Sequence, residues 1–428
     1  MAYEVELTDG AQRDLATWHY PIEHLSYPGD DSVGERWERP PLEVHVPDSL
    51  PADRPPLICV LGSSGFKGSW QAGICEVIEE LSNPVRWDLA SGGTIPGLAC
   101  AAGINRRWRR VMNAGVPSYK VLRRVGGLQW FERKNLDLAG VYDLSEVEKW
   151  LEAWLAWAGV ATFRDLRYRP SEPRPVGVRH RAGVSVVMWR TRRPFPDRCT
   201  PQQLRDPSFV HKAFRWAFFG RQFPFKQFRQ VWVPDNIGEH LPWLADEIDD
   251  HSPAWWARVS MSQWPACLPT VLQDPETLQL VFLSDGGHID NQPSLFNDGR
   301  PVSLPLINPR LAQNRRQSSN SQLEHDRGRM PYGRVVRFEV TAPTRWNALR
   351  GHHLTWADRD AMWLRGVEQG RDRLPYELKE LVRAYSDSLE RAPAIGLQPM
   401  VETPMFHGFQ AIAAARRAGT KRVFGLRS

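Results

Sequence analysis

Three glycine-rich turns carry the side chains of this chain that could perform covalent chemistry. The first, GSSGFKGS, spans residues 62–69 and contains a lysine. The second, DLASGGTIPG, spans residues 88–97 and places a serine before two glycines. The third, SDGGHIDNQP, spans residues 284–293 and places an aspartate before two glycines. A serine, a carboxylate and a cluster of backbone N–H groups are the parts that nucleophilic acyl transfer requires.

The first turn indicates a site for negative charge. Gly65, Lys67 and Gly68 lie between an apolar run and a helical pattern, where several backbone N–H groups and a helix N-terminus converge. Such a loop forms either a phosphate cradle or an oxyanion hole. The nucleotide-binding pattern GxxxxGK[ST] is absent, because Lys67 precedes Gly68, and GxGxxG is absent as well. A tight turn without any ligand is the other interpretation.

The second turn resembles a nucleophile elbow, in which a serine sits on a strand-to-helix turn so sharp that its neighbours must be small. The usual pattern is GxSxG; here Gly93 supplies the second glycine and Leu89 stands in place of the first. A competing register would make Thr94 the nucleophile. Pro96 fits the first turn of the following helix, so we favour Ser91.

The elements around these turns predict an α/β fold. Strand-like runs at 55–62 and 84–90 alternate with helical patterns at 69–82 and 94–108, which is the order of a parallel sheet. Further strands are expected at 182–189, 278–287 and 333–342, and further helices at 142–159, 374–391 and 405–419. The third turn therefore places Asp285 at a strand end, facing a neighbouring strand end, although a plain β-turn would have the same residues.

The three turns, in this order, resemble those of the patatin-like phospholipase family over roughly residues 57–300. The segment SMSQWPACLPTV at 260–271 also resembles the small-residue and proline segment that precedes the family's aspartate. The resemblance implies a three-layer sandwich whose mainly parallel central sheet is flanked by helices. It also implies a nucleophile, Ser91, a single base, Asp285, and an oxyanion loop formed by Gly65, Phe66, Lys67 and Gly68.

The activity implied by this resemblance is that of a lipid acyl hydrolase, a phospholipase A-type serine esterase that needs no metal and no cofactor. A Ser–His–Asp triad using His288 is a rival, which the resemblance disfavours. Ser63, Ser64 and Leu89 stand where the family has glycines. This departure fits a second candidate, a catalytically impaired patatin-like binding or scaffold protein. A partner-activated phospholipase effector is a third.

The domain organisation expected from the sequence is one catalytic core with additions. Residues 1–56 form an N-terminal arm packed on the core, and residues 57–310 form the core itself. Residues 311–330, polar and almost without apolar side chains, form a flexible loop. Residues 331–428 complete the same domain with a strand and helices.

Composition limits the partners and the location. The net charge of +6 is spread along the chain and favours an anionic partner, a phospholipid headgroup layer or nucleic acid, and no nucleic-acid-binding pattern is present. The partner that the resemblance implies is a phospholipid or acyl ester at a membrane surface. An oligomer or an activating partner stays open. Five scattered cysteines, no apolar leader and no long apolar run favour a cytoplasmic protein, with peripheral membrane association as a variant.

Three other segments allow alternative interpretations. The aromatic and basic segment 213–232 is expected to pack in the core, with a membrane-facing or acyl-binding element as the alternative. Asp249, Asp250 and His251 are expected to form a solvated charge cluster rather than a metal site. His352 and His353 are expected to lie on the surface.

Overall fold

The computed structural model describes these parts of the chain: residues 54–62, 64, 67–105, 139–140, 142–172, 177–220, 222, 228–264, 266–289, 293–295, 306–307 and 356–389. It also gives the strand pairs β1 (Tyr3–Glu6) with β2 (Leu15–Trp18), β5 (Arg123–Arg124) with β6 (Tyr142–Asp143), and β12 (Arg310–Leu311) with β13 (Arg337–Phe338). The main helices are α1 (Gly68–Leu81), α2 (Thr94–Ala101), α5 (Ser145–Trp157), α6 (Pro201–Arg205), α7 (Pro207–Phe219), α8 (Ile237–His240), α9 (Pro253–Met261) and α11 (Trp356–Leu389).

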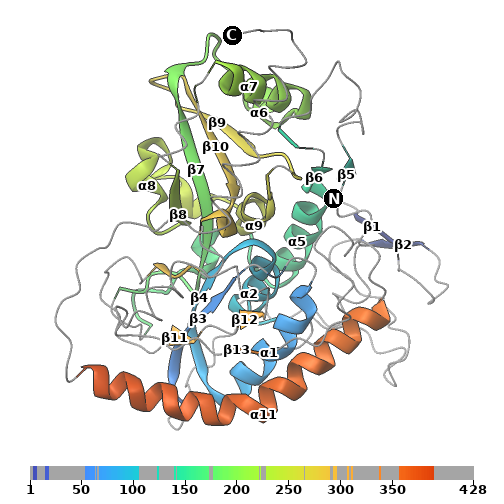
Figure 1. Cartoon of the computed structure of the whole chain (residues 1–428), viewed down its shortest axis with the longest axis vertical. Helices are drawn as coiled ribbons and strands as arrows, with labels where there is room; N and C mark the ends of the chain where they lie inside the picture. Colours follow the sequence, from blue (N-terminus) through green and yellow to red (C-terminus); the bar gives the residue numbers. More distant parts are fainter. Residues whose placement is uncertain are drawn as a thin grey trace, which may run out of the picture.

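A seven-stranded sheet forms the centre of the molecule (Figure 1). Its order is β11 (Leu306–Ile307), β3 (Pro56–Leu61), β4 (Asn83–Leu89), β7 (Ala182–Pro194), β10 (Gln279–Asp285) and β9 (Thr270–Gln273), with β8 (Arg229–Val233) paired to β7. Strands β11, β3, β4 and β7 pair in parallel, whereas β10, β9 and β8 join antiparallel. The expected α/β class, with a largely parallel central sheet flanked by helices, is confirmed and is compatible with a three-layer sandwich.

The long strand β7 pairs with three other strands. Val184 pairs with Leu89 of β4 and also with Val233 of β8, so β4 and β8 occupy opposite edges of β7. Strands β8 and β10 overlap along β7 at Val186 and must likewise lie on opposite edges. It follows that β4 and β10 share one edge of β7 and approach each other end to end.

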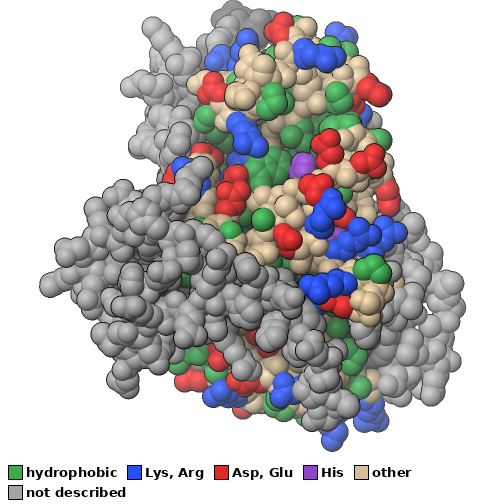
Figure 2. All heavy atoms as spheres, turned by 180° about the vertical axis from the view of Figure 1, so that it is seen from behind, with side chains coloured by type: hydrophobic (Ala, Val, Ile, Leu, Met, Phe, Trp, Pro, Cys, Tyr) green, Lys and Arg blue, Asp and Glu red, His purple; other side chains and the backbone are tan. Residues whose placement is uncertain are grey.

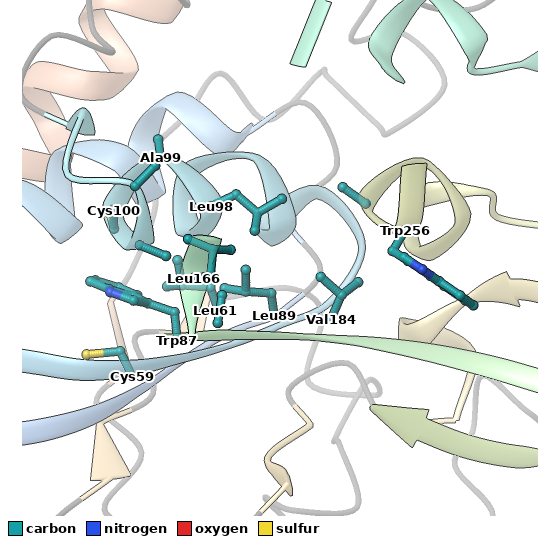
Figure 3. Packing of buried hydrophobic residues seen from close by; sticks show 14 of the residues in the cluster. Cys59, Leu61, Trp87, Leu89, Leu98, Ala99, Cys100, Leu166, Val184 and Trp256 are labelled. Carbon is teal, nitrogen blue, oxygen red and sulfur yellow. The ribbon is translucent and has the colours of Figure 1, made fainter. Parts of the chain in front are cut away.

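The strand residues explain why this sheet is buried. In β3 the run LICVL is apolar without interruption, as expected for a parallel strand covered on both faces. Ile58 and Val60 join one buried cluster, while Cys59 and Leu61 join the larger cluster on the other face. Figure 3 shows part of this larger cluster, where Trp87 and Leu89 of β4 lie beneath Leu98 of α2.

Helix α11 covers α1 on the helical side of this core (Figure 1). The indole N–H of Trp70 donates to the side-chain oxygen of Gln369 at 2.8 Å. Leu374 and Leu378 of α11 are buried in the same core cluster. The predicted helix at 374–391 is therefore the second half of a longer helix that begins at Trp356, and the apolar contacts hold this helix across Pro375.

A second core lies over the upper part of β7 and β10. Phe214 and Phe218 of α7 are buried there, and Phe214 meets Phe282 of β10 edge to face at 5.7 Å between ring centroids. Trp189 of β7 stacks on Phe282. For α7 the interpretation of the aromatic segment as a core element is therefore confirmed, whereas residues 223–227 lie outside the described residues.

Several other expectations are only partly covered. The predicted strand at 333–342 is represented by Arg337–Phe338, and the predicted helix at 94–108 ends at Ala101. The loop at 312–330, the helix at 405–419 and most of the arm at 1–56 lie outside the described residues. No helix in the described part of the chain is long and apolar enough to cross a membrane.

Candidate active site

Ser91 occupies a sharp turn between β4 and α2. Strand β4 ends at Leu89, a single 3₁₀ turn covers Ser91–Gly93, and α2 begins at Thr94. The backbone angle φ of Ser91 is +51°, in the left-handed region that residues other than glycine rarely adopt. Such strained positions cluster at functional sites, and a nucleophile elbow requires this conformation.

Asp285 lies at the end of β10 and faces Ser91. The Ser91 hydroxyl donates a hydrogen bond to Asp285 Oδ2 at 2.8 Å. The other carboxylate oxygen, Oδ1, accepts the backbone N–H of Gly287 at 2.7 Å. Ser91 is 8% exposed and Asp285 is 2% exposed. The structure thus brings together the serine and the aspartate of two different turns and fixes the carboxylate from both sides.

The surroundings of Asp285 make its carboxylate a stronger base than usual. Burial raises the pKa of Asp285 to about 7, although the hydrogen bonds from Gly287 and Ser91 act in the opposite direction. An ordinary aspartate has a pKa of about 3.9 and accepts a proton poorly at neutral pH. A carboxylate with a pKa near 7 has the proton affinity that a general base needs there.

Small residues allow the elbow to pack closely against the first glycine-rich turn. The backbone N–H of Ala90 donates to the Leu61 carbonyl at 2.9 Å. A Cβ atom at Gly93 would lie 2.5 Å from the carbonyl oxygen of Gly62. Because real Cβ atoms do not approach backbone oxygens so closely, Gly93 is required for the first and second turns to touch.

The packing also explains why Leu89 can replace the first glycine of the elbow. A Cβ atom at Gly97, one helical turn into α2, would overlap Cδ2 of Leu89. Leu89 is fully buried beneath α2 (Figure 3). The glycine that the elbow lacks at position 89 is therefore matched by a glycine at 97, which makes room for the leucine side chain.

Thr94, the competing nucleophile, has its hydroxyl engaged in the turn. Its Oγ1 donates to the carbonyl oxygen of Ser91 at 2.6 Å, and the residue is fully buried. A threonine hydroxyl commonly bonds to a backbone carbonyl three or four residues earlier in this way. The Ser91 hydroxyl donates to a carboxylate instead.

Two residues of the expected oxyanion loop are described. Lys67 precedes the first residue of α1, Gly68, and its backbone N–H donates to the Ser64 carbonyl at 3.1 Å. Partial burial lowers the pKa of the Lys67 side chain. Gly65 and Phe66 lie outside the described residues.

His288 lies in the 3₁₀ turn Gly286–His288 that follows β10 and is buried. Burial lowers its pKa to about 4, so the imidazole is neutral at physiological pH. In a triad the aspartate would orient the histidine and the histidine would hold the serine. Here Asp285 accepts the serine hydroxyl directly.

A buried ion-pair network next to the elbow was not expected from the sequence. Arg86 and Asp88 are fully buried, and Arg86 bonds Asp88 Oδ1 at 2.9 Å and Asp235 Oδ2 at 2.6 Å. Asp88 Oδ2 accepts bonds from the Ser294 hydroxyl and the Leu295 N–H, both at 3.1 Å. The spacing of Arg86 and Asp88 puts both side chains on one face of β4, which is the signal that could have revealed them.

The acidic residues at 249 and 250 belong to ion pairs. Asp250 pairs with Arg164 through exposed side chains, whereas the partly buried Asp249 pairs with the exposed Arg167 and bonds the buried His180. In Figure 2 acidic and basic side chains are interspersed on the face of the molecule that is seen from behind. Within the described residues, no group of three or more His, Cys, Asp or Glu is arranged to hold a metal ion. His352 and His353 lie outside the described residues.

Comparison with known proteins adds little to this geometry. No family model matches the chain, and no curated protein matches it. Among solved structures, the crystal structure of VipD from Legionella pneumophila is similar, with 10% sequence identity and a TM-score of 0.27, over 74% of this chain and 67% of that chain. A likeness of this degree gives no information about the function of this chain, so the evidence for the site is its own geometry.

The match between Leu89 and Gly97 predicts a non-additive pair of substitutions. Gly→Ala inside a helix ordinarily stabilises by about 1 kcal/mol, but Gly97→Ala is expected to destabilise by about 1–3 kcal/mol because the new methyl overlaps Leu89. Leu89→Ala alone is expected to cost about 2–5 kcal/mol. In the double variant the overlap disappears, and a favourable coupling energy of about 1–3 kcal/mol is expected from urea unfolding.

Leu374→Ala, which removes a buried leucine of α11, is the control partner for this cycle. Gly97→Ala combined with Leu374→Ala should be additive within about 0.5 kcal/mol. Additivity of Gly97→Ala with Leu89→Ala as well would show that the two residues do not compensate one another.

Proposed function

We propose that this protein is a lipid acyl hydrolase in which Ser91 is the nucleophile and Asp285 the general base. The observation that carries the proposal is the 2.8 Å hydrogen bond from the Ser91 hydroxyl to a buried carboxylate, made by a serine in the strained conformation of an elbow. A serine is a weak nucleophile unless a neighbouring base removes its proton, and Asp285 is in contact with that proton.

In the proposed reaction, Asp285 Oδ2 takes the proton of Ser91 Oγ while Oγ bonds to the ester carbonyl carbon. The carbonyl oxygen then carries the negative charge, and the expected oxyanion loop stabilises it through backbone N–H groups other than that of Lys67, which donates to Ser64. When the C–O bond to the alcohol breaks, Asp285 returns the proton to the leaving oxygen. The products of this half-reaction are the alcohol and an acyl group esterified to Ser91.

Water completes the cycle. Asp285 accepts a proton from a water molecule, whose oxygen bonds to the acyl carbon of the Ser91 ester. The second tetrahedral intermediate collapses, Ser91 Oγ regains the proton from Asp285, and the carboxylic acid leaves. One carboxylate serves both half-reactions because the proton moves over the same hydrogen bond in each.

The choice of a lipid ester follows from the resemblance of the three turns to those of patatin-like phospholipases. The direct Ser91–Asp285 contact supports a dyad over a triad with His288. The bond from the Thr94 hydroxyl to the Ser91 carbonyl supports Ser91 over Thr94. A substrate at a membrane surface, and an oligomer or activating partner, belong to the same proposal.

The proposal is tested by release of free fatty acid from vesicles of mixed phospholipids. Ser91→Ala and Asp285→Asn are each expected to lower the rate by at least about a thousandfold, because nucleophile and base act as one unit. His288→Ala is expected to lower it by no more than about tenfold. Thr94→Val, which removes only the hydroxyl that bonds the turn, is expected to keep more than a tenth of the rate.

Circular dichroism of each variant controls for folding in this experiment. Equal, complete loss in His288→Ala and Asp285→Asn, with both folds intact, would replace the dyad by a triad. Hydrolysis by Ser91→Ala at the wild-type rate would remove Ser91 from the chemistry. Vesicle binding by the wild type without any hydrolysis would favour a scaffold.

The raised pKa of Asp285 predicts the pH dependence of the reaction. The base acts only when ionised, so log kcat/KM is expected to rise with unit slope up to about pH 7 and to level off above it. An acid limb near pH 4 would mean that the carboxylate titrates like an ordinary aspartate.

Thermal unfolding provides a check that is independent of turnover. Since the pKa of folded Asp285 lies above its unfolded value of about 3.9, wild-type stability falls as the pH rises from about 4 to 7. Asp285→Asn removes this penalty. It should therefore raise Tm at pH 8, and this advantage should disappear toward pH 4.

A further inference from the structure

We propose that Ser260 is a positioning residue of the dyad: its hydroxyl fixes the backbone of Ser91 at the distance from Asp285 that proton transfer requires. The inference rests on the proposed function. It assigns a role to a residue of α9 that contributes no group to the chemistry itself.

The hydroxyl of Ser260 links Ser91 to the sheet. Its Oγ accepts the backbone N–H of Ser91 at 2.9 Å and donates to the carbonyl oxygen of Ser185 at 2.6 Å. A serine hydroxyl has one hydrogen, so donation to Ser185 leaves only the lone pairs of Oγ toward Ser91. The direction of both bonds is therefore fixed, and Ser260 holds the Ser91 backbone without competing for the Ser91 hydroxyl.

The place of Ser185 on β7 explains why this link is needed. Leu89 of β4 pairs with Val184, and Asp285 of β10 pairs with Val186, so Ser185 is the residue between the two strand ends. The Ser91 N–H has left the sheet ladder and is buried, and a buried N–H without a partner would cost about 1–3 kcal/mol. Ser260 satisfies it from a helix outside the sheet.

The same end of α9 also holds the other half of the dyad. The carbonyl oxygen of Ser262 accepts the backbone N–H of Asp285 at 3.2 Å and the hydroxyl of Ser284 at 2.7 Å. Ser260 and Ser262 are both buried at the C-terminal end of α9, which lies beside the middle of β7 (Figure 1). One helix end thus contacts both strand ends and sets the spacing between Ser91 and Asp285.

Helix α9 is itself anchored away from the site. Arg258 pairs with Glu148 of α5 at 2.6 Å, and its side chain lies over the ring of Trp255. Trp256 is fully buried in the main core (Figure 3). The clamp formed by Ser260 and Ser262 is consequently attached to a fixed element, so a change at Ser260 should move Ser91 rather than α9.

The test compares Ser260→Ala with Ser82→Ala in the full chain, using fatty acid release from phospholipid vesicles. Ser260→Ala removes the bond to Ser91, and kcat is expected to fall about ten- to a hundredfold, with KM within about twofold, because displacement of a reacting group lowers turnover. Ser82→Ala, the control, removes another buried serine hydroxyl, which donates to the Ile78 carbonyl at the C-terminal end of α1. Its kcat should stay within about threefold of wild type.

A pH profile separates positioning from a general loss of folded protein. The hydrogen bond from Ser91 lowers the pKa of Asp285, so displacement of Ser91 should move the acid limb of Ser260→Ala to higher pH. A variant that is merely less stable keeps the wild-type limb. Ser260→Thr and Ser260→Val provide a second comparison if Ser260→Ala does not fold. The two side chains have the same shape, but only threonine carries a hydroxyl. Ser260→Thr should therefore be at least about tenfold more active than Ser260→Val.

Equal activity of Ser260→Thr and Ser260→Val, or a Ser260→Ala variant with wild-type kcat and acid limb, would overturn the role of Ser260. With either result the proposed function would still stand, provided that Ser91→Ala is inactive. Conversely, activity of Ser91→Ala equal to that of the wild type would overturn the dyad, and with it the role of Ser260.

Discussion

Strands β4 and β10 reach the same edge of β7 from opposite directions, and neither can extend past the other. Leu89 pairs with Val184 and Asp285 pairs with Val186, so a single residue of β7 separates the two ends. Each of the two strands must end at that point, and the chain leaves each of them through a turn that only small residues permit. The serine of one turn and the aspartate of the other are therefore directed toward the same point, although they are far apart in the sequence.

This arrangement opposes folding at the two residues on which the proposed chemistry depends. A left-handed serine and a buried carboxyl each destabilise the folded state by an amount on the order of 1–3 kcal/mol. The surrounding structure offsets these costs with hydrogen bonds from the end of α9 and with the close packing of Leu89 against Gly97. The segment after Asp285 is tied back to β4 through Asp88, so the two turns support one another.

The sequence predicted the parts of this structure that depend on local residues. The strands at 55–62, 84–90 and 278–287 and the sharp turn at Ser91 follow from apolar runs and glycines, which act within a few residues. The antiparallel approach of β10 and the contacts of Ser260 could not be predicted, because they depend on how distant segments meet. Leu89 departs from the elbow pattern in the sequence. The structure explains how it is accommodated, because Gly97 of α2 leaves room for its side chain.

Covalent labelling with a fluorophosphonate, followed by peptide mapping by mass spectrometry, shows directly whether Ser91 is an activated nucleophile, because the reagent marks an activated serine whatever the substrate. With Ser91 as nucleophile and Asp285 as base, we expect a single adduct on Ser91 in the wild type and in Thr94→Val, none in Ser91→Ala, and much slower labelling in Asp285→Asn. An adduct on Thr94, or labelling of Ser91→Ala at the wild-type rate, would contradict this assignment.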